Sequence, residues 1–282
     1  MPTTTTAAPD RTAQLVEQLQ SHVRALISSE DWQRWLVIAA RFHRYSFNNQ
    51  ILIAAQRPNA THVAGYRNWQ SLGRQVRRGE RGIAILAPCT QSRTDTDPDT
   101  GDETTHTILR GFRPVTVFDI TQTDGDPLPI PAAPAMIDGN APATLLANLT
   151  AQIHALGFTY RRAPLPQRPG ANGLTDYETH TVTVRPDLPQ GHAAKTTAHE
   201  LAHVLLHHPR SGIRARSHAE VEAESVAYVV CHASGLDTGP YTFPYVAAWA
   251  HGDLTVVTAT AERVVAAART ILDNLDRALP DR

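Results

Sequence analysis

The motif His199-Glu200-x-x-His203 is the feature that most constrains what this chain can fold into. Residues four apart on an α-helix lie one turn apart on the same face, so the two imidazoles can bind one metal ion at roughly 2.1 Å. Glu200 is placed to take a proton from a water that the metal activates and to pass it to a leaving amine. Apolar residues at 194–206 recur at helical spacing, which predicts a helix with one buried face.

A second helical pattern, at residues 220–227, carries three glutamates. The rotation of ~100° per residue puts Glu220 and Glu224 on one face and turns Glu222 about 160° away from Glu220. Glu222 is therefore the least suitable metal ligand of the three. Glu220 and Glu224 are both candidates for the third ligand of one zinc ion, and an open fourth position would admit water.

The other histidines near the motif are expected to face solvent or to have protein partners, and they are His192, His207, His208, His218 and His232. His207 is the exception among them, because it continues the i, i+4 series from His203 and is expected to line the mouth of a cleft. Two alternatives stay open at this point. The motif is ordinary helix sequence, or it forms a zinc site that no longer hydrolyses anything.

The length of 282 residues favours two domains, and the prolines between Gly125 and Ala143 predict a semi-rigid extended linker between them. Cys89 and Cys231 are far apart and form no CxxC pair, so the sequence offers neither a disulfide framework nor a cysteine zinc site. No stretch approaches ~18 apolar residues, and the polar start lacks the features of a signal peptide. We therefore expect a cytoplasmic protein with no membrane partner.

Helical and alternating patterns both occur along the chain, which indicates an α+β fold. Two helices are expected to open it, one with apolar residues between Leu15 and Ile27 and one from about Trp32. Further helices are expected at 144–156 and 255–279. Strands are expected at 83–87, 115–118, 158–160 and 180–184, and residues 92–106 are expected to form an exposed loop or ribbon.

Arginine dominates residues 32–88, which contain nine arginines and one acidic residue, Glu80. Aromatic residues lie between these arginines. Guanidinium groups that follow phosphates and rings that stack on bases are what a binder of single-stranded DNA needs. The opposing interpretation is that half or more of the aromatics belong to the core. The residues concerned are Arg41, Arg44, Tyr45, Phe47, Tyr66, Arg67, Trp69, Arg74, Arg77, Arg78 and Arg81.

The metal motif and the glutamate-bearing helix after it resemble the ImmA/IrrE type of zinc metallopeptidase. The resemblance implies that Glu220 is the third zinc ligand and that Glu224 orients a ligand histidine. The reverse assignment of the two glutamates stays open. Glu200 would be the catalytic general base. By the same resemblance, residues 182–184 are expected to form the edge strand along which an extended peptide substrate lies.

Four blocks in the first half resemble the N-terminal domain of ArdC-type antirestriction proteins, which binds single-stranded DNA. They lie at 45–53, at 65–73, at 76–82 and at 117–125. The acidic insertion at 95–103 departs from this pattern and is expected to point away from DNA. The resemblance implies DNA contacts by Arg44, Tyr45, Asn49, Arg67, Trp69, Arg74, Arg77, Arg78 and Arg81.

These observations predict a DNA-binding α+β domain at residues 1–125, ordered from about residue 10, and a linker at 126–143. A zincin-like metallopeptidase domain with C-terminal helices would follow at 144–282, and residues 245–249 are expected to help cover it. The predicted function is peptide hydrolysis with one zinc ion in a protein that binds single-stranded DNA, with an unknown protein or peptide substrate. The alternative is a DNA-coating antirestriction protein whose zinc is structural.

Overall fold

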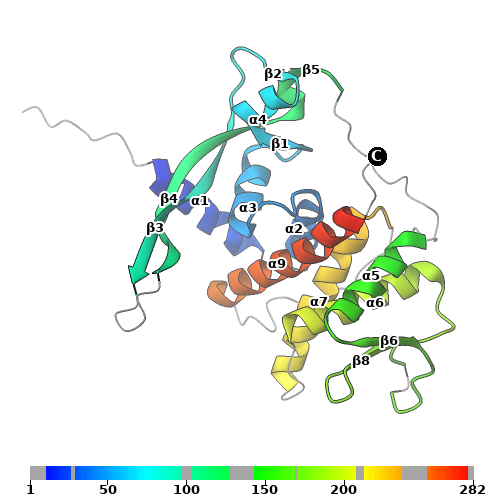
Figure 1. Ribbon diagram of the computed structural model, residues 1–282. Coiled ribbons are helices and arrows are strands. Elements are labelled where there is room, and N and C mark those ends of the chain that lie inside the picture. Colours follow the sequence, from blue (N-terminus) through cyan, green and yellow to red (C-terminus); the bar gives the residue numbers. More distant parts are fainter. Residues whose placement is uncertain are drawn as a thin grey trace, which may run out of the picture. The chain divides into compact units, whose positions relative to one another are not determined.

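The protein is described by a computed structural model that covers residues 11–26, 29–96, 103–127, 143–168, 170–207, 213–236 and 253–278. It forms two compact units (Figure 1). The first unit comprises Met1–His22 and Asn48–Leu128, and the second comprises Val23–Phe47 and Pro129–Arg282. Two hydrophobic interiors result, and helices and strands both occur, which confirms the predicted α+β class.

The first unit is built around a long antiparallel hairpin, whose strands β3 and β4 pair with a bulge between Cys89 and Thr90. The short strand β1 adds to β4 and gives the sheet order β1-β4-β3, while β2 and β5 form a separate antiparallel pair. The elements are α1 (Arg11–Ala25), α3 (Phe47–Gln56), β1 (Val63–Gly65), α4 (Tyr66–Ser71), β2 (Arg74–Val76), β3 (Ile83–Thr96), β4 (Glu103–Asp119), η1 (Ile120–Gln122) and β5 (Thr123–Gly125).

Side-chain amides hold α3 along the edge of β3. The Asn49 amide donates to the Leu86 carbonyl and accepts from the Leu86 N–H, both at 2.9 Å. About two turns further on, Gln56 makes the same pair of bonds with Ala84, at 2.7 and 2.9 Å. The edge of β3 is therefore partly covered by side chains instead of a further strand.

The second unit places helices against a small mixed sheet (Figure 1). Strand β8 lies in the middle of the order β6-β8-β7, parallel to β6 and antiparallel to β7. Helix α6 contacts β7, β8, α5, α7 and α9. The elements are α2 (Ser29–Arg41), α5 (Ala143–Ala155), β6 (Thr159–Arg162), β7 (Gly173–Asp176), β8 (Thr181–Val184), α6 (Gln190–Leu206), α7 (Ile213–Ala233) and α9 (Leu254–Ala278).

The sheet order corrects the expected edge strand. All four residues of β8 are buried and β8 pairs on both sides, so Val182–Val184 cannot receive a further strand. The edge on the α6 side is β7, because α6 contacts β7 and β7 pairs only with β8 among the described strands. The prediction was wrong because a run of five residues is too short to show whether a strand is half buried or fully buried.

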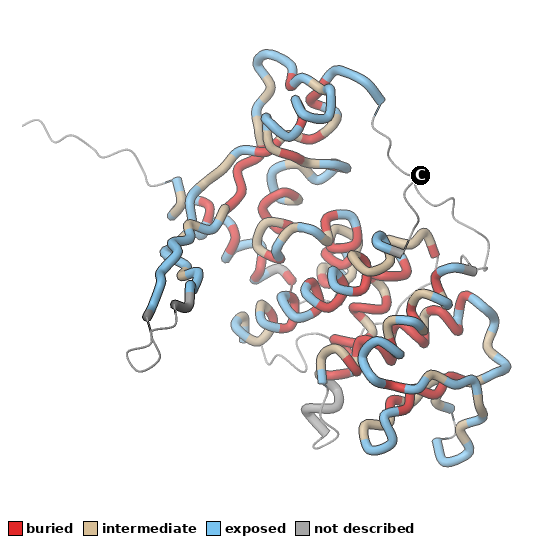
Figure 2. Tube along the Cα trace, in the orientation of Figure 1, coloured by how far each residue is buried: buried red, intermediate tan, exposed pale blue. Residues whose placement is uncertain are grey.

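Helix α2 packs in the second unit, whereas the domain boundaries expected from the sequence placed it in the first domain. Its residues Trp32, Trp35 and Leu36 are fully buried or nearly so, and α2 contacts α7. The Trp32 indole N–H donates to the Ser225 hydroxyl of α7 at 3.0 Å. Figure 2 shows buried residues running through the helices of this unit. Apolar packing thus assigns residues 23–47 to the unit that contains the metal motif.

The other expected elements agree with the structure. The exposed ribbon is the outer part of the β3–β4 hairpin, where residues 91–95 are exposed. The predicted helices at 144–156 and 255–279 correspond to α5 and α9. The expected linker lies mainly at 128–142, which is outside the described residues, as are residues 97–102 of the acidic insertion and the patch at 245–249. None of the described helices is long and apolar enough to cross a membrane.

Candidate metal centre

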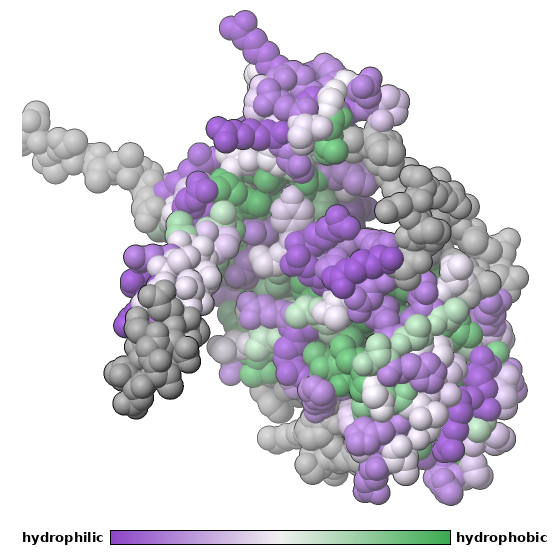
Figure 3. All heavy atoms as spheres, in the orientation of Figure 1, coloured by the Kyte–Doolittle hydropathy of each residue, from purple (hydrophilic) through white to green (hydrophobic). Residues whose placement is uncertain are grey.

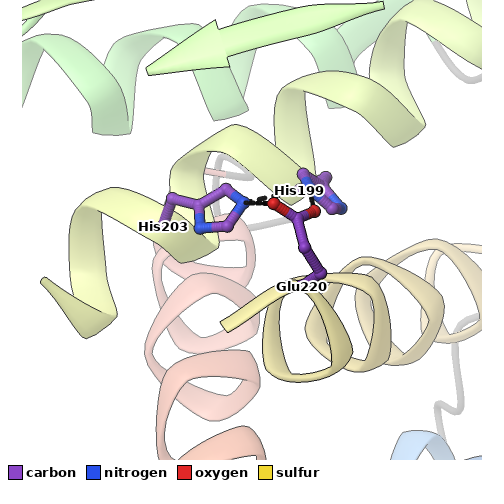
Figure 4. Close-up of side chains that lie close together, drawn as sticks. All are labelled: His199, His203 and Glu220. Carbon is purple, nitrogen blue, oxygen red and sulfur yellow. Dashed lines mark hydrogen bonds and ion pairs between the residues drawn. The ribbon is translucent and has the colours of Figure 1, made fainter. Parts of the chain in front are cut away.

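Helices α6 and α7 bring three donor side chains to one point (Figure 4). His199 and His203 come from α6, and Glu220 comes from α7. The His199 and His203 Nε2 atoms are 3.0 Å apart. Glu220 oxygens lie 3.3 Å from His199 Nε2 and 3.8 Å from His203 Nε2. Both imidazoles are mostly buried, whereas the Glu220 side chain is 53% exposed.

These separations fit a divalent metal ion. Tetrahedral ligands at ~2.1 Å from a metal are roughly 3.4 Å from one another, and the three observed distances bracket that value. Two imidazole nitrogens and one carboxylate are also a donor set that zinc and other first-row divalent ions accept. The geometry therefore favours Glu220 over Glu224 as the third donor, because Glu224 reaches the other side of His199.

Glu224 and Lys195 fix the orientation of His199. Glu224 Oε2 lies 3.0 Å from His199 Nδ1, and Glu224 Oε1 lies 2.8 Å from Lys195 Nζ. Burial opposes charge on His199, but hydrogen bonds with Glu220 and Glu224 outweigh it and raise the pKa of His199 to about 10. Burial also favours a neutral Glu224, yet hydrogen bonds from His199 and Lys195 lower its pKa. The site therefore favours positive charge at His199 Nε2, from a proton or a metal ion.

Glu200 lies beside the donors and is held by strand β7. The Thr175 hydroxyl donates to Glu200 Oε2 at 2.7 Å. A Cβ at Gly173 would lie 2.5 Å from Glu200 Oε1, so the carboxylate fits only against a glycine. Burial raises the pKa of Glu200 above its usual value. A carboxylate with a raised pKa is better matched to proton transfer near neutral pH.

A cleft of about 440 Å³ opens over these residues. One wall is β7 with the residues just before it, and α6 and α7 supply the others. The cleft contains the three donors, Glu200, Glu224 and Lys195. A cavity of this size beside convergent polar groups is typical of a small-molecule or peptide site. The lining residues outside the motif are Arg168, Ala171, Asn172, Gly173, Leu174, Thr175, Tyr177, His192, Thr196 and Ala219.

Several surrounding residues differ from their sequence-based expectations. His207 ends α6 in a left-handed conformation, with φ 49°, and does not line the described cleft, whereas exposed His192 does. Glu222 points away from the donors, as predicted, and pairs with Arg263 of α9 at 2.9 Å. The sequence analysis missed Thr175, Lys195 and Arg263. A glycine at the start of β7 was the one available signal, since glycine within a strand often marks a close approach.

The structure separates the predicted DNA-binding residues into three groups. One group supports the fold. Trp69 is 2% exposed and donates its indole N–H to the Phe118 carbonyl, so it has no free face for stacking. Arg74 binds Thr123 and the Gly125 carbonyl, and Asn49 binds β3. The sequence around these residues does not reveal whether their side chains form bonds within the protein or contact a ligand.

The second group is exposed. Arg67, Arg78 and Arg81 of the first unit are exposed, and Figure 3 shows hydrophilic residues gathered over α4, β2 and β5. Arg77 is also exposed but binds Glu80 at 2.6 Å and Asp124 at 3.3 Å. The remaining two belong to the second unit. There, Arg44 pairs with Asp276 at 2.9 Å, and Tyr45 packs edge-on against Phe42, with burial raising its pKa.

Comparisons with known protein families give one match in the first half of the chain and one in the second half. Residues 6–118 match the family described as the N-terminal domain of anti-restriction factor ArdC. Residues 153–231 match a peptidase family described as the IrrE N-terminal-like domain. The first half of the chain is therefore similar to the ArdC N-terminal domain, and residues 153–231 are similar to the IrrE-like domain. Both resemblances inferred from the sequence motifs are thereby confirmed, and the IrrE-like match spans α6 and most of α7.

Similar proteins match this chain at low identity or over a small part of its length. The Mn(II)-bound crystal structure of the antirestriction ArdC protein from R388 plasmid is 20% identical, with a TM-score of 0.55 over 93% of this chain and 99% of that one. An uncharacterized protein of Bacillus anthracis is 22% identical over 99% of this chain, which spans 54% of that relative. An uncharacterized protein of Sinorhizobium fredii is 44% identical over 21% of this chain and 20% of its own length. The solved structure supports the fold.

Proposed function

We propose that the chain is a zinc-dependent peptidase whose ArdC N-terminal domain binds single-stranded DNA, in an antirestriction or mobile-element setting. The convergence of His199, His203 and Glu220 beside the carboxylate of Glu200 carries the hydrolytic part of the proposal. These three residues would hold the ion. Bound zinc polarises a carbonyl and makes water more acidic. The Mn(II) bound in the similar ArdC structure supports a divalent metal ion in this chain.

Each residue around the donors has a definite task in this proposal. Glu200 takes a proton from the attacking water and returns it to the leaving amine. The Thr175 hydroxyl holds one Glu200 oxygen at 2.7 Å and leaves the other oxygen for the water. Glu224, itself paired with Lys195, holds the His199 ring by Nδ1. Such a partner fixes the ring orientation and strengthens the imidazole as a ligand.

Strand β7 is suited to hold an extended peptide. It is a sheet edge, it lines the cleft, and its residues Gly173 and Thr175 lie against Glu200. A peptide that pairs with β7 would place its backbone beside the metal donors, with main-chain hydrogen bonds for affinity. Peptide bonds are therefore the substrate class that this cleft suits best.

The Glu200→Gln variant tests the peptidase function. It keeps the size of the side chain and the three donors but removes the base, so cleavage of a peptide pool should fall by about 10²–10⁴. Zinc content, measured by elemental analysis, should stay at one ion per chain. Glu178→Gln, an exposed residue of the adjacent turn, serves as the control. Undiminished cleavage by Glu200→Gln would exclude this mechanism.

The exposed arginines of the first unit support the DNA-binding part. Arg67, Arg78 and Arg81 carry positive charge in a unit where arginines outnumber acids around α4 and β2. Replacing all three by alanine should weaken binding of a fluorescent oligodeoxythymidine. It should also reduce the slope of log affinity against log salt by about 2, since each lost phosphate contact contributes ~0.7. Arg277→Ala, on α9, is the control and should bind normally.

A second candidate is a DNA-coating protein whose metal only stabilises the fold, and the same exposed arginines favour it. The two functions differ in how Glu200→Gln behaves in a restriction-protection assay. A coating protein protects DNA equally well with Glu200→Gln, whereas a peptidase that acts on restriction enzymes loses protection. Salt-independent affinity for DNA, or no affinity, would reject the DNA-binding part of both candidates.

A further inference from the structure

The cleft continues beyond the metal donors toward the start of α6, where its lining includes the guanidinium of Arg168. Arg168 and His192 line this end, whereas Lys195 pairs with Glu224 nearer the donors. A helix rises 1.5 Å per residue, so His192 lies about 10 Å along the axis from His199. The lining carboxylates belong to Glu200, Glu220 and Glu224, at the donor end. The two ends of the cleft therefore differ in charge.

The carboxylates of the lining are already engaged within the site. Glu224 pairs with Lys195 at 2.8 Å, Glu220 lies 3.3 Å from a histidine donor, and Glu200 accepts from Thr175. Arg168 differs from these groups. Its guanidinium is exposed and makes no hydrogen bond or ion pair with any residue that the structure describes. This end of the cleft therefore has a cation with no ion-pair partner among the described residues.

The Arg168 end of the cleft lies next to the start of β7, along which the proposed peptide substrate would run. Asn172 directly precedes β7, and its amide lies 3.1 Å from His192 Nε2 of α6. Arg168 lies a few residues earlier in the same segment, which is turned back by a hydrogen bond from the Ala171 N–H to the Arg168 carbonyl at 3.1 Å. An extended peptide rises ~3.3 Å per residue, so it covers 10 Å in about three residues.

We propose that the Arg168 end of the cleft binds a carboxylate of the substrate. Peptides would then be preferred when an acidic side chain, or the chain's own carboxyl terminus, lies about three residues from the scissile bond. Arg168 supplies a planar pair of donors that matches a carboxylate. His192 and Asn172 complete the polar surroundings. This inference rests on the proposed peptidase function and specifies the substrate class for the same cleft.

Cleavage of a peptide pool tests the preference. The pool contains ten-residue peptides with amidated C-termini in which one position varies between Asp and Asn, and a matched pool has free C-termini. With zinc-loaded full-length protein, Asp about three residues from the cut should be favoured over Asn by about tenfold. Arg168→Gln should reduce this preference to about twofold or less. Arg277→Gln, an equal loss of charge on α9, should leave it unchanged.

A binding measurement separates failure of this inference from failure of the proposed function. Fluorescein-labelled Asp and Asn peptides are titrated with zinc-loaded Glu200→Gln, with and without Arg168→Gln. Cleavage without an acidic preference overturns the carboxylate site and leaves the peptidase intact. No cleavage, but Asp-selective binding that Arg168→Gln removes, supports the carboxylate site and rejects hydrolysis. Neither cleavage nor selective binding overturns both. Faster cleavage of the free-acid pool than of the amidated pool, with no preference for Asp over Asn and loss of the difference in Arg168→Gln, identifies the C-terminus as the carboxylate.

Discussion

At the scale of single residues, the position of the Glu200 carboxylate depends on a glycine far away in the sequence. The Gly173 Cα faces Glu200 so closely that a methyl group would lie 2.5 Å from Oε1 and 2.7 Å from a Thr196 carbon. The Glu200 carboxylate can move more easily than the Thr196 methyl group, because it lies at the end of a longer side chain. A larger residue at 173 would therefore move the proposed base and leave the metal donors in place.

Gly173→Ala should lower peptide cleavage by about tenfold to a hundredfold, since displacement of a catalytic group by about 1 Å has effects of that size. Zinc content and the thermal midpoint should change little. The control is Gly65→Ala, where an added Cβ meets nothing within 4 Å and φ is −68°. Wild-type cleavage by Gly173→Ala would show that Glu200 does not act from its position in the structure.

At the scale of elements, α9 ties together the two helices that carry the donors. Arg263 of α9 binds both oxygens of Glu222 on α7, at 2.9 and 3.2 Å, and donates to the Leu206 carbonyl at the end of α6, at 3.2 Å. The Glu222 side chain is 2% exposed. Since Glu222 lies between Glu220 and Glu224 in sequence, this contact helps to hold the third donor near the histidines.

Arg263→Ala should destabilise the protein by about 2 kcal/mol and weaken zinc binding, because it removes the guanidinium that binds the buried Glu222 carboxylate. Urea unfolding and competition with a zinc chelator measure the two effects. Arg269→Ala removes an exposed i, i+4 pair on the same helix and should change stability by less than about 0.5 kcal/mol. Adding Glu222→Gln to Arg263→Ala should recover part of the stability. Equal effects of both arginine variants would contradict the proposed bracing by Arg263.

At the scale of the whole molecule, the unit that contains the metal donors is not continuous in sequence. Helix α2 precedes the blocks that resemble the ArdC N-terminal domain but packs against α7, and its Trp32 and Trp35 are 0% and 1% exposed. Trp35 also contacts Phe47 edge-on, with ring centroids 5.3 Å apart. The match to the ArdC N-terminal domain, over residues 6–118, therefore includes helix α2, which helps to form the core of the second unit.

A chain of residues 143–282 alone should fail to fold stably, because the α7 surface that receives α2 would be exposed to water. Loss of two buried tryptophans corresponds to roughly 6–10 kcal/mol, which exceeds half the stability of a typical domain. Circular dichroism melts and zinc content of this fragment, compared with the full chain, measure the effect. A fragment that melts cooperatively at the temperature of the full chain would show that α2 is dispensable.

Local patterns determined much of the fold and the centre of the candidate site. The helical period alone places His199 and His203 on one face, separates Glu222 from Glu220, and predicts the helices that became α5, α6, α7 and α9. These features follow from interactions within a few residues of one another, which the sequence displays directly. The choice between Glu220 and Glu224 stayed open, because it depends on how two helices cross.

Only the tertiary structure decided which distant segments meet. It placed Gly173 and Thr175 of β7 against Glu200, put β8 in the middle of its sheet, and buried Trp69, which had been expected to contact DNA. Sheet order and core packing depend on burial of apolar surface between residues far apart in the chain. The sequence alone therefore determined the two histidine donors, and long-range packing favoured Glu220 as the third and determined the cleft around them.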